Sequence, residues 1–179
     1  MKILKRILLF LLSLVIIALI VALFVKKDYA VERSVTINKP KTEVFDYIKY
    51  LKNQDNYSKW AKMDANMKKT YTGTDATPGF ISAWDSDKKD VGKGEQEIKK
   101  IADGARVDYE LRFKKPWEST AQSYLSTDSV SPTQTKVSWG ITGHMPYPMN
   151  IMQLFMNMDK MLGSDLEIGL GNLKVLEEK

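Results

Sequence analysis

The most regular hydrophobic pattern in the chain is an unbroken apolar run near its N-terminus. Residues 7–25 contain no charged side chain and a single polar one, Ser13. At about 1.5 Å per residue, a helix of this length spans roughly 28 Å, close to the hydrocarbon core of a bilayer. We therefore expect a single transmembrane helix and assign residues 1–28 to an N-terminal membrane anchor.

Two other interpretations of this run are weaker. A cleaved signal peptide usually has a shorter apolar region, followed by a small-residue cleavage site of the A-x-A type, and no such site follows here. A buried core helix would normally carry a polar face, and this run has none.

Beyond residue 28 the pattern changes to the period of two that is typical of β-strands. Val31, Val35 and Ile37 alternate with polar residues, and Arg33 interrupts their apolar face, which indicates an edge strand or one end of a sheet. Six more alternating segments follow, separated by turn-forming sequences such as Asp-Gly. They cover residues 66–74, 80–85, 92–101, 106–113, 119–130 and 135–144. Sequential hairpins of this kind predict an antiparallel meander.

Apolar residues at helical spacing occur in three places after the anchor. Val44, Phe45 and Ile48 predict a short helix after Pro40, and residues 53–62 predict a second one. The last stretch, residues 148–179, is the long amphipathic candidate of the water-soluble part. Because a sheet with one apolar face needs a cover, we expect this stretch to cover it.

The C-terminal stretch carries two signals for a break. Gly163 is a natural helix terminator, and Ser164 with Glu167 matches the S-x-x-E capping box that begins a helix. We therefore expect two helical pieces, residues 149–162 and 165–178, with a joint near Gly163.

These two pieces differ in composition. The first is rich in methionine, a flexible apolar side chain, and we expect it to lie near the mouth of any cavity. The second contains Gly169 and Gly171, which we expect to allow close approach to the sheet at a cost of about 1 kcal/mol of helix propensity each.

The net charge of +5 and the pI near 9.2 belong to one part of the chain. The first 27 residues carry five basic side chains and no acidic one, whereas the remaining 152 residues carry 22 of each. A nucleic-acid-binding surface is therefore not expected. The more positive flank precedes the apolar run, which predicts a cytoplasmic N-terminus and a domain on the outer face of the membrane.

Reactive side chains are scarce. The chain has no cysteine and one histidine, His144, so disulfides, thiolate ligands and multi-histidine metal sites are excluded. No loop has the spacing of a calcium site, and we predict no metal site and no cofactor. His144 is a candidate polar site residue because histidine often transfers protons near neutral pH, although the sequence ties no nucleophile to it. Asp159, Asp165 and Glu167 offer a candidate carboxylate pair.

Three motifs together resemble the START-related, polyketide cyclase-like superfamily, also called SRPBCC or helix-grip. They are VTINKPKTEVFDYI, NQDNYSKW and DLEIGLGNLKVLEE, in this order, with six expected strands between the second and the third. The resemblance covers residues 29–179 and implies an α+β helix-grip fold: one strand, two helices, six strands and a final helix. The seven strands would form a curved antiparallel sheet wrapped around the C-terminal helix.

The same resemblance implies a cavity between sheet and C-terminal helix that takes an apolar or amphipathic small molecule or a lipid. It carries no shared catalytic motif, so no catalytic residue is predicted. Candidate cavity residues are inward-facing side chains of the expected strands and part of the methionine-rich piece, for which ordinary core is the competing interpretation. They are Phe80, Trp84, Val107, Tyr109, Leu111, Phe113, Trp139, Met152, Phe155 and Met156.

Three functional hypotheses remain open. The favoured one is a membrane-tethered, non-catalytic module that binds a hydrophobic small molecule or lipid. The second is an enzyme of the polyketide cyclase or hydrolase type that uses His144 or a tyrosine of the pocket, and it requires His144 to face the cavity. The third is a partner-binding envelope or stress-response module, which an exposed apolar patch would favour.

Overall fold

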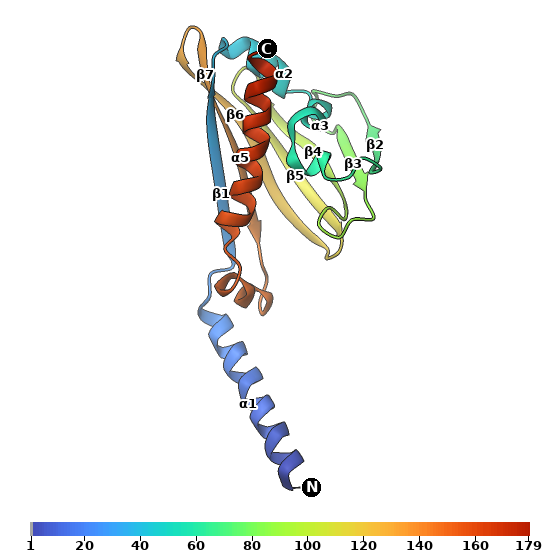
Figure 1. Ribbon diagram of the computed structural model, residues 1–179, viewed down its shortest axis with the longest axis vertical. Coiled ribbons are helices and arrows are strands. Elements are labelled where there is room, and N and C mark those ends of the chain that lie inside the picture. The colour runs from blue at the N-terminus through green and yellow to red at the C-terminus, as the bar shows by residue number, and fades with distance from the viewer. Residues whose placement is uncertain (1) are drawn as a thin grey trace.

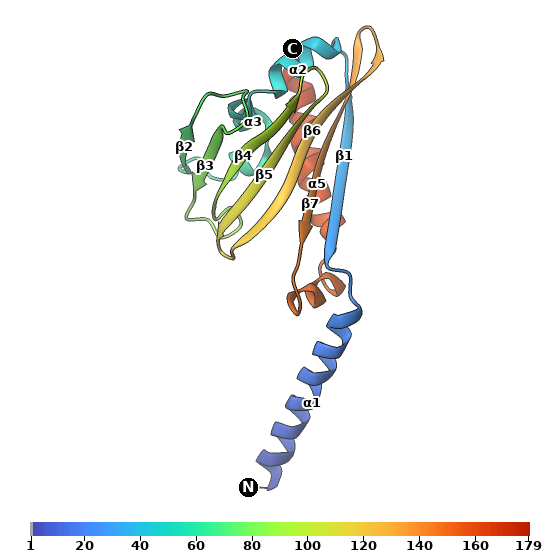
Figure 2. The ribbon, with the colours of Figure 1, turned by 180° about the vertical axis from the view of Figure 1, so that it is seen from behind.

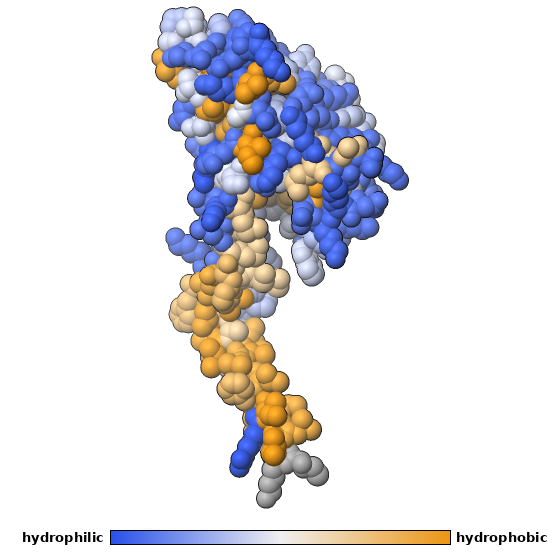
Figure 3. Space-filling view, in the orientation of Figure 1, coloured by the Kyte–Doolittle hydropathy of each residue, from blue (hydrophilic) through white to orange (hydrophobic). Residues whose placement is uncertain are grey.

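The computed structural model describes residues 2–179 as an apolar helix joined to a folded domain (Figure 1). The helix, α1 (Lys2–Phe24), projects from the domain, and apolar side chains are exposed along its length (Figure 3). Within the described residues it is the one helix long and apolar enough to cross a membrane.

The domain is built on a curved antiparallel sheet, as the sequence predicts. Within residues 2–179 the sheet has seven strands in the order β1-β7-β6-β5-β4-β3-β2. Strands β2 to β7 follow one another as a meander, and β1 pairs with β7 from Asp28 opposite His144 to Ile37 opposite Thr135. The bounds are β1 (Asp28–Ile37), β2 (Lys68–Thr72), β3 (Ile81–Asp85), β4 (Lys93–Ala102), β5 (Arg106–Lys115), β6 (Ser119–Ser131) and β7 (Gln134–His144).

Short helices connect β1 to β2. They are α2 (Lys41–Ile48), the 3-10 turn η1 (Leu51–Asn53), α3 (Gln54–Tyr57) and α4 (Lys59–Lys62). The single helix expected over residues 53–62 is divided at Ser58, whose φ of −60° and ψ of 131° are extended. An extended residue cannot continue the helical hydrogen-bond ladder, so the chain turns there and begins a new helix.

The break expected at Gly163 is wrong. The final helix, α5 (Met158–Glu177), runs through Gly163 and Ser164, and the break lies earlier, after the 3-10 segment η2 (Met149–Leu154). Asn157 caps α5 instead, because its side chain accepts a hydrogen bond of 2.8 Å from the Lys160 backbone N–H. Because α5 begins directly after Asn157, Ser164 lies inside the helix and does not cap it.

Arg33 shows why α5 has a glycine, Gly163, in its second turn. The guanidinium donates hydrogen bonds to Asp159 (2.8 Å) and Glu167 (2.6 Å), which lie about two turns apart on α5. A Cβ at Gly163 would collide with the same guanidinium. Arg33 also lowers the pKa of Asp159 through these contacts. Two of the candidate carboxylates are therefore held by Arg33, and β1 is an edge strand, as its interrupted face predicts.

A single helix covers only part of the concave face. α5 packs on β1 and β7 (Figures 1 and 2). A helix is about 10–12 Å wide with its side chains and strands lie about 4.8 Å apart, so one helix covers roughly two strands. Over β3 to β6 the cover comes from the short helices between β1 and β2, which include α3 and α4.

The approach of α5 to the sheet depends on Gly169. A Cβ at Gly169 would lie 2.8 Å from Cζ3 of the buried Trp139. At Gly171 a Cβ would meet no atom of the described residues within 4 Å. The expectation that both glycines permit close packing is therefore wrong for Gly171.

This difference gives a matched pair of substitutions. Gly171→Ala should raise the free energy of unfolding by about 1 kcal/mol through helix propensity. Gly169→Ala gains the same helix propensity, but overpacking against the Trp139 ring should lower its free energy of unfolding by about 1–3 kcal/mol. Urea unfolding of the full chain in detergent micelles, followed by tryptophan fluorescence, measures both. Equal stabilities of the two variants would contradict this account of α5.

Candidate functional site

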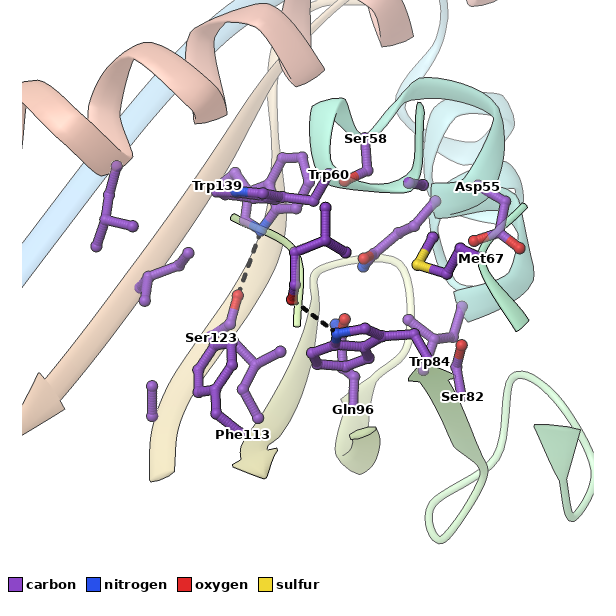
Figure 4. Close-up of a pocket in the computed structure, with 18 of the residues that line it drawn as sticks. Asp55, Ser58, Trp60, Met67, Ser82, Trp84, Gln96, Phe113, Ser123 and Trp139 are labelled. Atoms are coloured by element: carbon purple, nitrogen blue, oxygen red, sulfur yellow. Dashed lines mark hydrogen bonds between the residues drawn. The ribbon is translucent and has the colours of Figure 1, made fainter. Parts of the chain in front are cut away.

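The candidate site is a cavity between the inner face of the sheet and helices α3 and α4 (Figure 4). Its volume is about 220 Å³. An engineered apolar cavity of about 150 Å³ holds benzene, so this volume suits one small molecule or one part of a larger one. Inward-facing side chains of the sheet, most of them on β3 to β7, form one wall, and α3, α4 and Leu162 of α5 form the opposite wall.

Trp139 lies where the core meets the cavity. Its ring meets Tyr57 and Trp60 edge-on, with centroid distances of 5.8 and 6.0 Å. Its Nε1–H donates to the Ser123 hydroxyl at 3.3 Å (Figure 4). Because this bond satisfies the indole nitrogen, the rest of the ring serves as apolar wall.

Trp84 forms a second aromatic wall. Its Nε1–H donates to the Val91 carbonyl at 3.2 Å, and its ring meets Phe113 edge-on at 5.9 Å. A Cβ at Gly94 on the neighbouring strand would lie 2.6 Å from Cζ2 of Trp84, so the glycine makes room for the ring. The β3–β4 loop and β4 thus hold Trp84 against the cavity.

Ion pairs hold the short helices over the cavity. Four-residue helices are not stable alone, because too few hydrogen bonds repay the cost of ordering them. Lys69 of β2 pairs with Asp55 of α3, and Lys59 of α4 pairs with Asp165 of α5. Asn172 of α5 also donates to the α3 backbone at 3.0 Å. These contacts fix the position of α3 and α4 relative to both the sheet and α5.

One polar side chain of the cavity wall lacks a hydrogen-bond partner. Gln54 lines the cavity and is only 6% exposed. Its Nε2 donates no hydrogen bond to any acceptor within residues 2–179. The hydroxyls of Tyr57 and Tyr109 are buried without partners among the same residues. Burial raises the pKa of both phenols. The Gln54 side chain lies close enough to the Tyr109 hydroxyl to offset part of this rise, although the two groups do not meet in hydrogen-bond geometry. Both tyrosines are therefore neutral hydroxyl groups over the physiological pH range.

Four of the ten candidate cavity residues lie in the wall: Trp84, Leu111, Phe113 and Trp139. Three others, Phe80, Val107 and Tyr109, are buried in the core beyond the wall. A strand pattern identifies the inner face of a sheet, but it does not show where along that face the cover leaves space.

The other three candidates, Met152, Phe155 and Met156, lie outside the cavity. The expectation that the methionine-rich piece lies at the cavity mouth is therefore wrong. Asn150 of η2 donates hydrogen bonds to α1, which ties this segment to the end of the apolar helix. Phe155, in the turn after η2, is 84% exposed.

His144 does not face the cavity. It ends β7, its side chain is 54% exposed, and its Nδ1 lies 2.6 Å from a carboxylate oxygen of Asp28. The enzyme hypothesis requires His144 to face the cavity, and this requirement is not met. Within residues 2–179 no three His, Asp or Glu side chains gather as metal ligands.

The sequence analysis missed the part of the wall that faces the sheet. Gln54, Asp55, Ser58, Trp60 and Ala61 line the cavity from α3 and α4. All five lie in or next to the segment NQDNYSKW, which the sequence analysis used only as a sign of the fold. The tryptophan of this short segment was the available signal, because a helix that faces only solvent would not need one.

Solved structures with very different sequences share this fold. The di-domain ARO/CYC BexL from the BE-7585A biosynthetic pathway aligns with a TM-score of 0.59 and 15% identity, over 85% of this chain and 50% of that one. Ara h 8.0201 aligns with a TM-score of 0.53 and 12% identity, over 82% and 97%. XoxI from Bacillus cereus aligns with a TM-score of 0.59 and 11% identity, over 83% and 94%. No family model and no curated protein matches the chain. At these identities the comparison establishes the helix-grip fold and no activity.

The unpartnered amide of Gln54 predicts a gain in stability when it is removed. Gln54→Leu replaces a buried, unpaired polar group by an apolar one of similar size and should raise the free energy of unfolding by about 1 kcal/mol. The control is Gln122→Leu on the exposed face of β6, which should change stability by less than about 0.5 kcal/mol. Chemical unfolding of the full chain measures both. A loss of stability in Gln54→Leu would show that the amide has a partner.

Proposed function

We propose that the chain is a membrane-anchored module that binds one small apolar or amphipathic molecule in the cavity between the sheet and helices α3 and α4. The observation that carries the proposal is a cavity whose wall combines aromatic rings with a buried amide that lacks a partner among residues 2–179. Ligand sites are typically apolar with few placed polar groups, and this wall has that composition.

Gln54 indicates the kind of polar group that the ligand carries. An amide N–H buried without an acceptor costs free energy, and a ligand oxygen could remove that cost. The ligand therefore has an apolar body that fits against Trp84 and Trp139, and a carbonyl, ether or hydroxyl oxygen that reaches Gln54. A purely charged molecule does not fit, because aromatic and apolar groups dominate the wall.

The anchor is α1. Its exposed apolar side chains and its length match a bilayer-spanning helix, and the basic residues at both of its ends match the two headgroup regions. The larger positive flank at the N-terminus supports a cytoplasmic N-terminus, with the binding domain on the outer face of the membrane.

The fold neighbours support this proposal only through the fold. One of them is named as an ARO/CYC protein, and that name belongs to that protein. We favour binding over catalysis for this chain because His144, its one histidine, lies at the surface beside Asp28 and outside the cavity wall.

The proposal is tested by filling the cavity. The full chain in lipid nanodiscs is titrated with Prodan, a fluorescent naphthalene that carries a ketone oxygen, with empty nanodiscs as the baseline. Energy transfer from Trp60, Trp84 and Trp139, which line the cavity, reports a probe in it. Ala121 is 4% exposed in the cavity wall, so Ala121→Leu should occupy the space and abolish transfer above the baseline. Thr120→Leu adds the same side chain to the outer face and should bind Prodan as the unaltered chain does.

Two further measurements keep this test decisive. Ala121→Leu should be at least as stable as the unaltered chain, because the new side chain fills a void instead of displacing neighbours. Gln54→Leu should bind Prodan about 2- to 10-fold more weakly through the loss of one hydrogen bond. Equal Prodan binding by Ala121→Leu and Thr120→Leu, or no binding by the unaltered chain, would overturn the proposal.

A further inference from the structure

A second exposed apolar surface lies at the end of the domain that joins α1. Leu154 is 57% exposed and Phe155 84% exposed, on η2 and the turn after it. Met149, Met152 and Met161 extend this surface, and at least two-fifths of each side chain is exposed. We call these five residues the basal apolar surface. A group of exposed apolar side chains this size marks a contact with another apolar partner.

Hydrogen bonds fix the basal apolar surface to the end of α1. The last carbonyl groups of a helix have no partner within it. Here Asn150 Nδ2 donates to the carbonyls of Ala22 (2.7 Å) and Val25 (2.9 Å), and Gln153 Nε2 donates to those of Lys26 and Lys27 at 3.1 and 3.2 Å. The segment is therefore held beside α1 by specific bonds and does not hang from the domain as a free loop.

The position of the surface identifies its partner as lipid. Figure 3 shows that the apolar surface of α1 continues into that of the adjoining end of the domain. Lys26 and Lys27 lie at the level where the two meet and are exposed, as basic residues at a bilayer surface are. Of the nearby acidic groups, Asp159 forms an ion pair with Arg33, and Asp28 lies against the His144 ring.

We propose that the basal apolar surface lies in the boundary between the headgroups and acyl chains of the bilayer that α1 enters, as a second membrane contact. The inference rests on the membrane anchor of the proposed function. Short amphipathic segments bury their apolar side chains about 5–10 Å into this boundary. With α1 tied to η2, the contact fixes the angle between domain and membrane.

This orientation has a consequence for the cavity. Its wall includes Tyr29 near the start of β1, Ile141 near the end of β7, Phe113 near the end of β5 and Leu162 in the early part of α5. All of these lie toward the end of the domain that joins α1, and Figure 3 shows the domain hollowed on that side. A domain seated on its basal apolar surface holds this end of the cavity toward lipid, so an apolar ligand has a short path between bilayer and cavity.

Single cysteines provide a direct test, because the chain has none of its own. Phe155→Cys and Leu154→Cys are labelled with nitrobenzoxadiazole, and the full chain is reconstituted in phosphatidylcholine vesicles with and without lipid that bears a nitroxide near the headgroup. Leu12→Cys in α1 reports the anchor, with a deep nitroxide lipid as its quencher. Val130→Cys, also an exposed apolar residue (57%), reports the far end of the domain, at the β6–β7 hairpin.

The expected result is emission shifted to shorter wavelength at 154 and 155, with several-fold stronger quenching by the nitroxide lipid than at 130. Iodide in the water should quench the label at 130 and not those at 154 and 155. Equal iodide quenching at all three positions overturns the proposal. Shielding from iodide without quenching by lipid overturns it in favour of contact between copies of the chain. If the label at 12 is not quenched by the deep nitroxide lipid, the anchor of the proposed function fails as well, whereas failure at 154 and 155 alone leaves the anchor intact.

Discussion

The structure depends on the mismatch between one long helix and a seven-stranded sheet. The sheet turns an apolar face inward, and all of that face must be removed from water. α5 reaches β1 and β7, since a helix is only about two strands wide. The rest of the cover comes from the short helices between β1 and β2. Such short pieces leave space behind them, and that space is the cavity.

The contacts that hold this arrangement are concentrated at a few positions on α5. Gly169 lets the helix approach Trp139, and Gly163 makes room for the Arg33 guanidinium between Asp159 and Glu167. Toward the cavity, pairs such as Lys59 with Asp165 hold the short helices in place. The same helix therefore defines the core on one side and limits the cavity on the other.

The end of the domain nearest α1 is organised differently. Its apolar side chains are exposed, and its buried polar group, Asn150, is bonded to carbonyls of α1 instead of to the sheet. This arrangement joins α1 to the domain through hydrogen bonds from side-chain amides to backbone carbonyls. The chain thus has an apolar interior that is closed by packing and an apolar base that packing leaves open.

Local patterns in the sequence determined the elements of this protein. Alternation located the strands, Arg33 marked the edge strand, and the unbroken run before residue 26 marked the apolar helix, because these properties depend on neighbours along the chain. Only the tertiary structure decided that α5 runs through Gly163, that Phe80, Val107 and Tyr109 are core, and that Gln54 faces the cavity. Each of these depends on which distant surface a side chain meets. A glycine that ends a helix and one that admits a guanidinium look alike in sequence, and only the position of β1 distinguishes them.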